Sequence, residues 1–225
     1  MSEPAIRLKN ESYHNKELEL LLSFPRVCVN HKHRVTGIIH VGAHLAEEAA
    51  DYRKMGVSVI HWVEGLPDKC EALRKLFHGN PAHHVHEAWL DRYKGLRTPM
   101  WRASNGMSSS LREPQAHLIE HPNVNFAATG EVTTTTLDDL MTGHSLELIN
   151  TLVMDVQGAE HSVMAGGEQI LAKVGAVYME INTKPLYAEI TLLPEMDSYM
   201  LRRGFLRLDT CLTEHGWGDA FYLRK

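Results

Sequence analysis

The sequence predicts an α/β fold built on a mostly parallel sheet, and three observations point to it. Short runs rich in β-branched residues alternate with segments whose apolar residues recur at helical spacing. Such alternation is typical of parallel strands joined by right-handed crossovers. The chain has 225 residues, of which 44% are hydrophobic, so it can bury one core of this kind.

The first part of the predicted domain alternates strands with helices. Strands are expected at 37–42, 57–64 and 83–89, and helices at 45–55 and 67–77. Gly56 is placed to end the first of these helices, and Pro67 to begin the second. Residues 1–35 form a lead-in segment with one helix at 15–23, which Pro25 stops.

The pattern lapses at residues 91–132, where Gly106, Pro114 and Pro122 punctuate a segment too long for an ordinary connection. We expect an inserted, functional loop there. Thr136 then opens a short helix through Met141. The remaining elements are a strand at 148–155, a helix at 160–171, a strand at 175–181, a helix at 194–203, and a closing antiparallel hairpin of 205–212 and 219–223. Residues 36–225 are therefore predicted to form a single domain.

The composition of the chain disfavours several classes of binding partner. The 23 basic and 28 acidic residues give a formal charge of −5, so no nucleic-acid partner is expected. Three widely separated cysteines disfavour a disulfide framework and fit a reducing, cytoplasmic location. No apolar stretch approaches the roughly 20 residues of a membrane span, so none is predicted.

The turn after the first strand distinguishes between cofactors. A dinucleotide fingerprint needs glycines at its second and third marked positions, where this chain has His44 and Glu47. Glu47 would place negative charge beside a pyrophosphate. Glu64 ends the second strand 22 residues after Gly42, near the spacing at which an acidic residue binds ribose hydroxyls. An adenosine cofactor with a positive sulfonium and no phosphate, S-adenosylmethionine, fits this pattern, although a glycine after a strand is also ordinary turn chemistry.

At this point the sequence resembles the FkbM-type methyltransferases, which have the class I S-adenosylmethionine-dependent, Rossmann-like fold. The matching blocks lie in order along 36–225, and they are IIHVGAH at 38–44, WVE at 62–64, NGMSSSL at 105–111, MDVQGAE at 154–160, EIN at 180–182 with LY at 186–187, and TEHGWGDA at 213–220. The commoner form of the first block has Asp and Asn where this chain has His40 and His44. The resemblance therefore implies a histidine-bearing branch of the family.

The resemblance implies a cofactor site made largely of turn residues. We expect the following residues to bind S-adenosylmethionine: Gly42, Ala43, His44, Glu64, Gly65, Trp89, Ser109, Asp155 and Gln157. Trp89 lies where class I enzymes hold the adenine, and its ring suits stacking, with an ordinary core tryptophan as the alternative. Ser109 belongs to a loop that would otherwise be interpreted as a solvated turn.

Methyl transfer to a hydroxyl needs an in-line nucleophile and a base. Asp155, at the end of the strand at 148–155, is the first candidate for a base or an acceptor-binding carboxylate, and a helix N-cap is the alternative. Glu180, with Asn182, ends the next strand and could meet acceptor hydroxyls, or be only a polar strand end. His215 is the third catalytic candidate, in the loop of the closing hairpin.

The 15 histidines raise the question of a metal. His84 and His86 share one face of a strand, but further ligands at zinc spacing are lacking, so no metal site is predicted. A divalent ion beside Asp155 is the remaining variant.

The sequence thus predicts a methyltransferase that moves a methyl group from S-adenosylmethionine to an oxygen. Family precedent supplies the acceptor, a sugar hydroxyl on a glycan or glycosylated small molecule. The rivals are a non-catalytic S-adenosylmethionine-binding module and a nucleotide-dependent oxidoreductase. Because most of the chain builds the sheet and its helices, little remains to grip an acceptor. That leaves a shallow site or a contribution from a second copy in a homo-oligomer.

Overall fold

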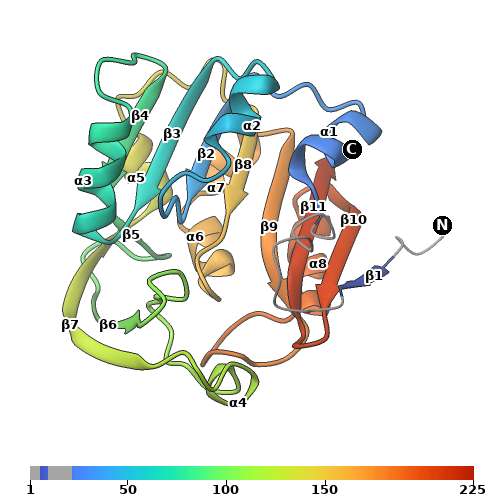
Figure 1. Cartoon of the computed structure of the whole chain (residues 1–225). Coiled ribbons are helices and arrows are strands. Elements are labelled where there is room, and N and C mark those ends of the chain that lie inside the picture. The colour runs from blue at the N-terminus through green and yellow to red at the C-terminus, as the bar shows by residue number, and fades with distance from the viewer. Residues whose placement is uncertain (1–5, 10–21) are drawn as a thin grey trace.

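The computed structural model describes residues 6–9 and 22–225. Its main sheet has eight strands in the order β1-β10-β11-β9-β8-β2-β3-β4 (Figure 1). The bounds are β1 Ile6–Lys9, β2 Gly37–Val41, β3 Val59–Glu64, β4 His83–Glu87, β8 Thr151–Met154, β9 Ala176–Asn182, β10 Phe205–Thr213 and β11 Trp217–Arg224. Strands β4, β3, β2, β8 and β9 run parallel, and β11 is antiparallel to β9 and β10. The predicted parallel sheet with a closing hairpin is confirmed.

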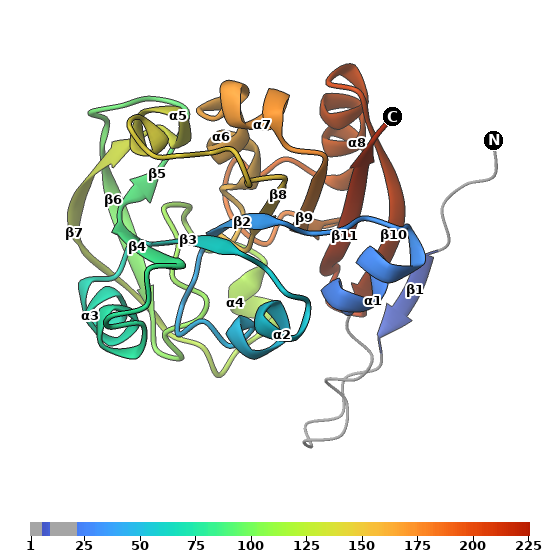
Figure 2. The ribbon, with the colours of Figure 1, turned by 90° about the horizontal axis from the view of Figure 1, so that it is seen from above.

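Helices cover both faces of this sheet (Figure 2). One face carries α1 Phe24–Asn30, α2 Ala49–Lys54 and α3 Pro67–Leu76. The other carries α5 Leu137–Met141, α6 Glu160–Ala165, α7 Glu168–Lys173 and α8 Leu193–Arg202. Strand β2 contributes to both cores, because Ile38 packs with the first group and Ile39 with the second. None of the helices in the described ranges is long and apolar enough to cross a bilayer.

Residues 91–132 are more regular than the sequence indicated. With the short strand β5 (Trp89–Leu90), the strands β6 (Arg97–Ala103) and β7 (Phe126–Thr135) form a second, three-stranded sheet, and α4 (His117–Glu120) lies between β6 and β7 in the chain. Pro99 is tolerated because β6 is an edge strand with a register shift between Pro99 and Trp101. This unit lies beyond the carboxyl ends of the main parallel strands (Figure 1).

Two of the predicted helices were wrong in their extent. The helix expected at 45–55 begins only at Ala49, because His44 and Ala46 adopt positive φ of 44° and 58° in the preceding turns. The helix expected at 160–171 is two helices, broken at Gly166 and Gly167. A Cβ on Gly166 would lie 2.4 Å from the Asp91 carbonyl oxygen, so the chain here packs too closely for a side chain.

Other boundaries agree or differ only locally. The Thr136 hydroxyl caps α5 by accepting from the Asp139 amide at 3.1 Å, as predicted. Pro25 lies in the first turn of α1 and begins a helix instead of ending one. Residues 15–21 of the helix expected at 15–23 lie outside the described residues. The strand expected at 83–89 ends at Glu87, and Trp89 belongs to the second sheet. A domain boundary at residue 36 stays a prediction.

A buried ion pair fastens the loop that follows β6 to the main domain. The Arg112 guanidinium donates from Nη2 to Asp91 Oδ2 at 2.9 Å and to Ser162 Oγ of α6 at 2.6 Å. The Asp91 side chain is only 5% exposed. Removing one partner of such a pair leaves a charge that water cannot solvate.

We expect Arg112→Met to lower the free energy of unfolding by about 3 kcal/mol, because it strands the Asp91 carboxylate. The double variant Arg112→Met with Asp91→Asn should recover part of this loss, since neither charge is then buried alone. Urea denaturation of the two single variants and the double variant measures the difference. A double variant as unstable as the sum of the two single variants would contradict this interpretation.

Candidate functional site

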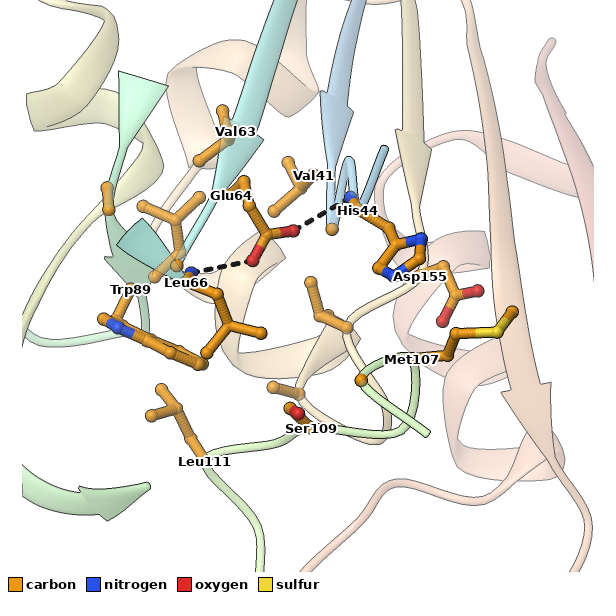
Figure 3. A pocket seen from close by; sticks show the side chains of 17 residues that line it. Val41, His44, Val63, Glu64, Leu66, Trp89, Met107, Ser109, Leu111 and Asp155 are labelled. Atoms are coloured by element: carbon orange, nitrogen blue, oxygen red, sulfur yellow. Dashed lines mark hydrogen bonds between the residues drawn. The ribbon is translucent and has the colours of Figure 1, made fainter. Parts of the chain in front are cut away.

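A pocket opens at the carboxyl ends of β2, β3 and β8, next to the point where strand order reverses (Figure 3). The space between its walls, mouth included, is about 590 Å³. It brings together seven of the predicted site residues, namely Gly42, His44, Glu64, Gly65, Trp89, Ser109 and Asp155. Four others, Ala43, Gln157, Glu180 and His215, are not part of its lining.

Gly42 allows the turn after β2 to lie against the end of β8. Its φ is +83°, and a Cβ at this position would be 1.8 Å from the Asp155 carbonyl oxygen. The amides of Gly42 and Ala43 both donate to the Val63 carbonyl, at 2.9 and 3.1 Å. Ala43 is 1% exposed, so it supports the turn from behind and is not part of the pocket surface.

Glu64 links two turns that frame the pocket. Its Oε2 accepts from the His44 amide at 2.9 Å, and its Oε1 accepts from the Leu66 amide at 2.8 Å (Figure 3). Burial raises the pKa of this carboxyl, although the hydrogen bonds from Leu66 and His44 oppose the rise. Each carboxylate oxygen keeps a second lone pair that a ligand hydroxyl could use.

Trp89 forms a flat apolar wall. A Cβ on Gly65 would lie 2.5 Å from the indole, so the ring packs directly on the Gly65 backbone. Glycine at 65 is therefore needed for this contact, which joins the end of β3 to β5 of the second sheet. The pocket-lining position of Trp89 is at odds with the alternative of an ordinary core tryptophan.

The serine loop closes the far side of the pocket. Of its three serines, only Ser109 lines the pocket, and its Oγ accepts from the Ala103 amide at 3.1 Å. The Ser110 hydroxyl donates to the Gln157 carbonyl at 2.8 Å and so fixes this loop to the turn after β8. Met107 and Leu111 also line the pocket. Both belong to the block at 105–111 that carries the resemblance, but neither was predicted as a site residue, because apolar residues in a loop resemble ordinary packing.

Asp155 and Glu180 are bridged by one amide. Gln157 Nε2 donates to Asp155 Oδ1 at 2.6 Å and to Glu180 Oε2 at 2.8 Å, while Tyr187 donates its hydroxyl to Gln157 Oε1 at 2.9 Å. Gln157 adopts a φ of +54°, which non-glycine residues rarely do. Glu180 is therefore not part of the pocket lining and is linked to Asp155 through Gln157. Gln157 also does not line the pocket, and its amide orients both acids.

The two acids differ in their surroundings. Burial and the nearby charges of Asp155 and Glu160 raise the pKa of Glu180 well above its usual range. Asp155 reaches solvent through the pocket, but protein packed around its other sides raises its pKa, against the hydrogen bond from Gln157. Of the two acids, Asp155 is the one whose carboxyl group faces the pocket.

Glu160 supports the turn after β8 from inside. Its Oε1 accepts from the Val156 amide at 3.0 Å and from the Gly158 amide at 3.3 Å, and the residue is 3% exposed. Burial raises its pKa to about 7, with its backbone hydrogen bonds opposing and the charge of Asp155 adding to the rise. Glu160 is not part of the pocket lining.

His215 lies elsewhere. Its Nδ1 is 2.8 Å from Glu120 Oε2 of α4, and its ring packs against His121. The second strand of the hairpin, expected at 219–223, begins earlier, at Trp217. The hairpin turn therefore faces α4, and a catalytic role for His215 stays a prediction without support from the pocket.

The remaining histidines are mainly packing residues. His40 is 3% exposed, and its Nδ1 lies 3.0 Å from the Tyr52 hydroxyl in an aromatic cluster with Trp62. Burial lowers its pKa to about 4, against the charges of Asp155 and Glu47. The His61 ring stacks on His84 and His86, and the His144 ring packs edge-on against His86. Within residues 6–9 and 22–225, no three His, Cys, Asp or Glu side chains are placed to hold a metal ion.

The charged side chains that line the pocket are acidic. Its lining includes two carboxylates, Glu64 and Asp155, and no lysine or arginine among the described residues. A ligand with phosphates would find no cation here, whereas a positively charged ligand with hydroxyls would be attracted.

Comparison with known proteins gives a family match. The family model described as "Methyltransferase FkbM domain" matches residues 40–207. The 2-O-methyltransferase NoeI of Sinorhizobium fredii is 39% identical over 98 residues, which span 40% of either chain. The alignment therefore covers less than half of that relative's length.

Solved structures show the fold alone. The magnesium protoporphyrin IX methyltransferase ChlM of Synechocystis PCC 6803 with bound SAH has a TM-score of 0.51 at 7% identity, covering 96% of this chain and 90% of that chain. The same enzyme with bound SAM has a TM-score of 0.50 at 8% identity, covering 89% and 76%. The expected Rossmann-like methyltransferase fold is confirmed.

The buried Glu160 makes stability depend on pH. An acid whose pKa rises from 4.5 to about 7 on folding stabilises the fold fully below pH 4.5 and loses that contribution as pH rises through 7. The loss amounts to roughly 3 kcal/mol by pH 8.

We expect Glu160→Gln, which keeps an acceptor oxygen for the two amides, to lose less stability than the wild type between pH 5 and pH 8. Glu180 and Asp155 titrate in the same sense, so some dependence should remain. Chemical denaturation across this range measures the slope, with the exposed Glu195→Gln as the control. Equal slopes in Glu160→Gln and the wild type would show that Glu160 is ionised in the fold.

Proposed function

Because the chain belongs to the FkbM methyltransferase family, whose members depend on S-adenosylmethionine, we propose that it transfers the cofactor's methyl group to the oxygen of a sugar hydroxyl. The observation that carries this proposal is the pocket at the ends of β2 and β3. It combines a glycine turn, an acidic strand end and an aromatic wall, without any cationic side chain in its lining.

The residues of the pocket fit S-adenosylmethionine. The indole of Trp89 would stack on the adenine, and the Glu64 carboxylate would accept hydrogen bonds from the ribose hydroxyls. The backbone of the Gly42 turn would lie close to the methionine end, with Asp155 as a counter-charge. When bound, the cofactor supplies an electrophilic methyl group on a sulfonium. The chain's part is to hold an acceptor oxygen in line with that group and to take its proton.

Two observations support a hydroxyl as the methyl acceptor. The relative NoeI is described as a 2-O-methyltransferase, which supports oxygen as the methylated atom. In the structure, the Asp155 carboxylate faces the pocket and could accept a hydrogen bond from a hydroxyl, while the Gln157 amide holds it in place. Neutral polyhydroxylated acceptors suit such an arrangement. A cytoplasmic location, a homo-oligomer and the absence of a nucleic-acid partner stay predictions.

The rival functions gain no support from the pocket. A nucleotide-dependent oxidoreductase would need to bind a pyrophosphate, and both Glu64 and Asp155 would repel it. A non-catalytic S-adenosylmethionine-binding module would have no use for an acid pair at the pocket wall.

Two measurements test the proposal. Thermal shift should show stabilisation by S-adenosylhomocysteine and none by NAD at the same concentration. Methyl-labelled S-adenosylmethionine, incubated with the protein and a panel of mono- and oligosaccharides, should then label one sugar, detected by mass spectrometry as a gain of one methyl. Stabilisation by NAD alone would refute the cofactor, and labelling of a nitrogen instead of an oxygen would refute the acceptor.

Glu64 should contribute strongly to cofactor affinity. We expect Glu64→Gln to weaken S-adenosylhomocysteine binding by about 10- to 100-fold, because a charge-assisted hydrogen bond is lost and the new amide group faces a backbone N–H. Isothermal titration calorimetry measures the change. The control is Glu87→Gln, the register neighbour of Glu64 on β4, which is exposed and paired with Arg74. Equal affinities in the two variants would contradict a ribose-binding role for Glu64.

A further inference from the structure

We propose that His44, oriented by Glu47, is the general base that takes the proton from the acceptor hydroxyl. This inference rests on the proposed methyl transfer and adds to it the identity of the proton acceptor. Four features of the turn after β2 carry it: a short contact from the ring to a carboxylate, an uncommitted ring nitrogen, a backbone conformation that fixes the ring, and the charges around it.

The first feature is the contact between His44 and Glu47. The distance from His44 Nδ1 to Glu47 Oε1 is 2.6 Å, and Glu47 Oε2 also accepts from the Leu45 amide at 3.3 Å. Burial alone would raise the pKa of Glu47, but its hydrogen bonds with the ring and with backbone amides outweigh that effect and lower it. The carboxylate is therefore ionised and accepts, so Nδ1 carries the proton.

The tautomer decides what the other nitrogen can do. With the proton on Nδ1, Nε2 presents a lone pair. In the described part of the chain this atom is shielded from solvent and has no hydrogen-bond partner. A buried polar atom without a partner is unfavourable, and it is explained when a ligand supplies the missing hydrogen. His44, Asp155 and Met107 all line the pocket (Figure 3).

The backbone fixes the direction of the ring. His44 has a φ of +44°, a left-handed conformation that costs a non-glycine residue about 1 kcal/mol or more. Its amide is held by Glu64 at 2.9 Å, while its ring is held by Glu47. The residue is therefore fixed at both ends, in the way a catalytic base needs to be oriented.

Acidic side chains surround the turn that carries His44. Glu47 and Glu48 lie on its own turn, Glu64 faces it from the end of β3, and Asp155 lines the same pocket at the end of β8. His40, from β2, is buried and neutral at pH 7. Positive charge that develops on the ring as it takes a proton is attracted by the carboxylates. Asp155 then holds the acceptor hydroxyl and counters the developing charge, while His44 receives the proton.

The step balances as follows. As the bond between the acceptor oxygen and the methyl carbon forms, the bond from that carbon to sulfur breaks and its electron pair stays on sulfur. The hydroxyl proton passes to His44 Nε2. The products are a methyl ether, S-adenosylhomocysteine and an imidazolium, which releases its proton to water.

Substitution of His44 tests the chemical role. His44→Asn keeps a side chain that tolerates positive φ and can bond Glu47. We expect kcat on the labelled sugar to fall by about 100- to 10,000-fold, with S-adenosylhomocysteine affinity within about threefold of the wild type. The rise of kcat with pH that reports the ring should disappear. His78→Asn, at an exposed position after α3, is the matched control and should leave all three unchanged.

Two further variants separate a base from other roles. His44→Gly suits the positive φ and leaves a space that free imidazole can enter, so added imidazole should restore part of kcat. Asp155→Asn should raise the acceptor KM but keep the pH dependence. A role for His44 in cofactor binding alone would instead lower S-adenosylhomocysteine affinity and leave the pH profile intact, and that result would overturn the proposal.

One measurement needs no acceptor. In ¹⁵N NMR spectra of the complex with S-adenosylhomocysteine, the His44 ring, assigned by its loss in His44→Asn, should show protonated Nδ1 and unprotonated Nε2 at neutral pH. The opposite tautomer would overturn the proposal even if the acceptor is still unknown. Failure to label any sugar, with the expected tautomer present, would refute the proposed acceptor and leave the ring assignment standing.

Discussion

The pocket depends on one close backbone contact. The turn after β2 can lie against the end of β8 only because position 42 has no side chain, and its positive φ sends the chain back across the sheet edge. From that contact follow the others. Glu64 can reach the amides of the turn on one side and of Leu66 on the other, and Asp155 is held facing the same space. Because position 42 is a glycine, the strand ends on either side of the switch point can together form this pocket.

The sequence predicted the sheet well because strand composition and the alternation of strand with helix are local signals. It failed where tertiary packing decides. Gly166 and Gly167 divide a continuous helical pattern because neighbouring backbone and Leu137 leave no room for side chains, which no periodicity reveals. Pro99 lies in the segment that was expected to be a loop, but an edge strand with a register shift can contain a proline. Strand pairing between β6 and β7 is equally invisible to a local pattern.

The site was predicted unevenly for the same reason. Gly42, Glu64 and Asp155 stand at strand ends, whose convergence follows from parallel topology, and the structure gathers them. His215 was predicted from its place in the loop of the closing hairpin. In the structure this loop directs its ring to Glu120 and away from the pocket. His44 and Glu47 are only three residues apart in the sequence. Their contact nevertheless depends on the shape of a turn in which His44 and Ala46 adopt positive φ. Backbone conformation of this kind cannot be deduced from residue types alone.

The position of Trp89 has a consequence for engineering. Its indole rests on Gly65 at the end of β3, but its backbone pairs with Thr134 in the second sheet. The wall that Trp89 forms in the pocket is therefore a joint between the main sheet and the second sheet. A chimaera that replaced residues 91–132 would have to keep β7 paired with β5, or it would displace this wall of the pocket.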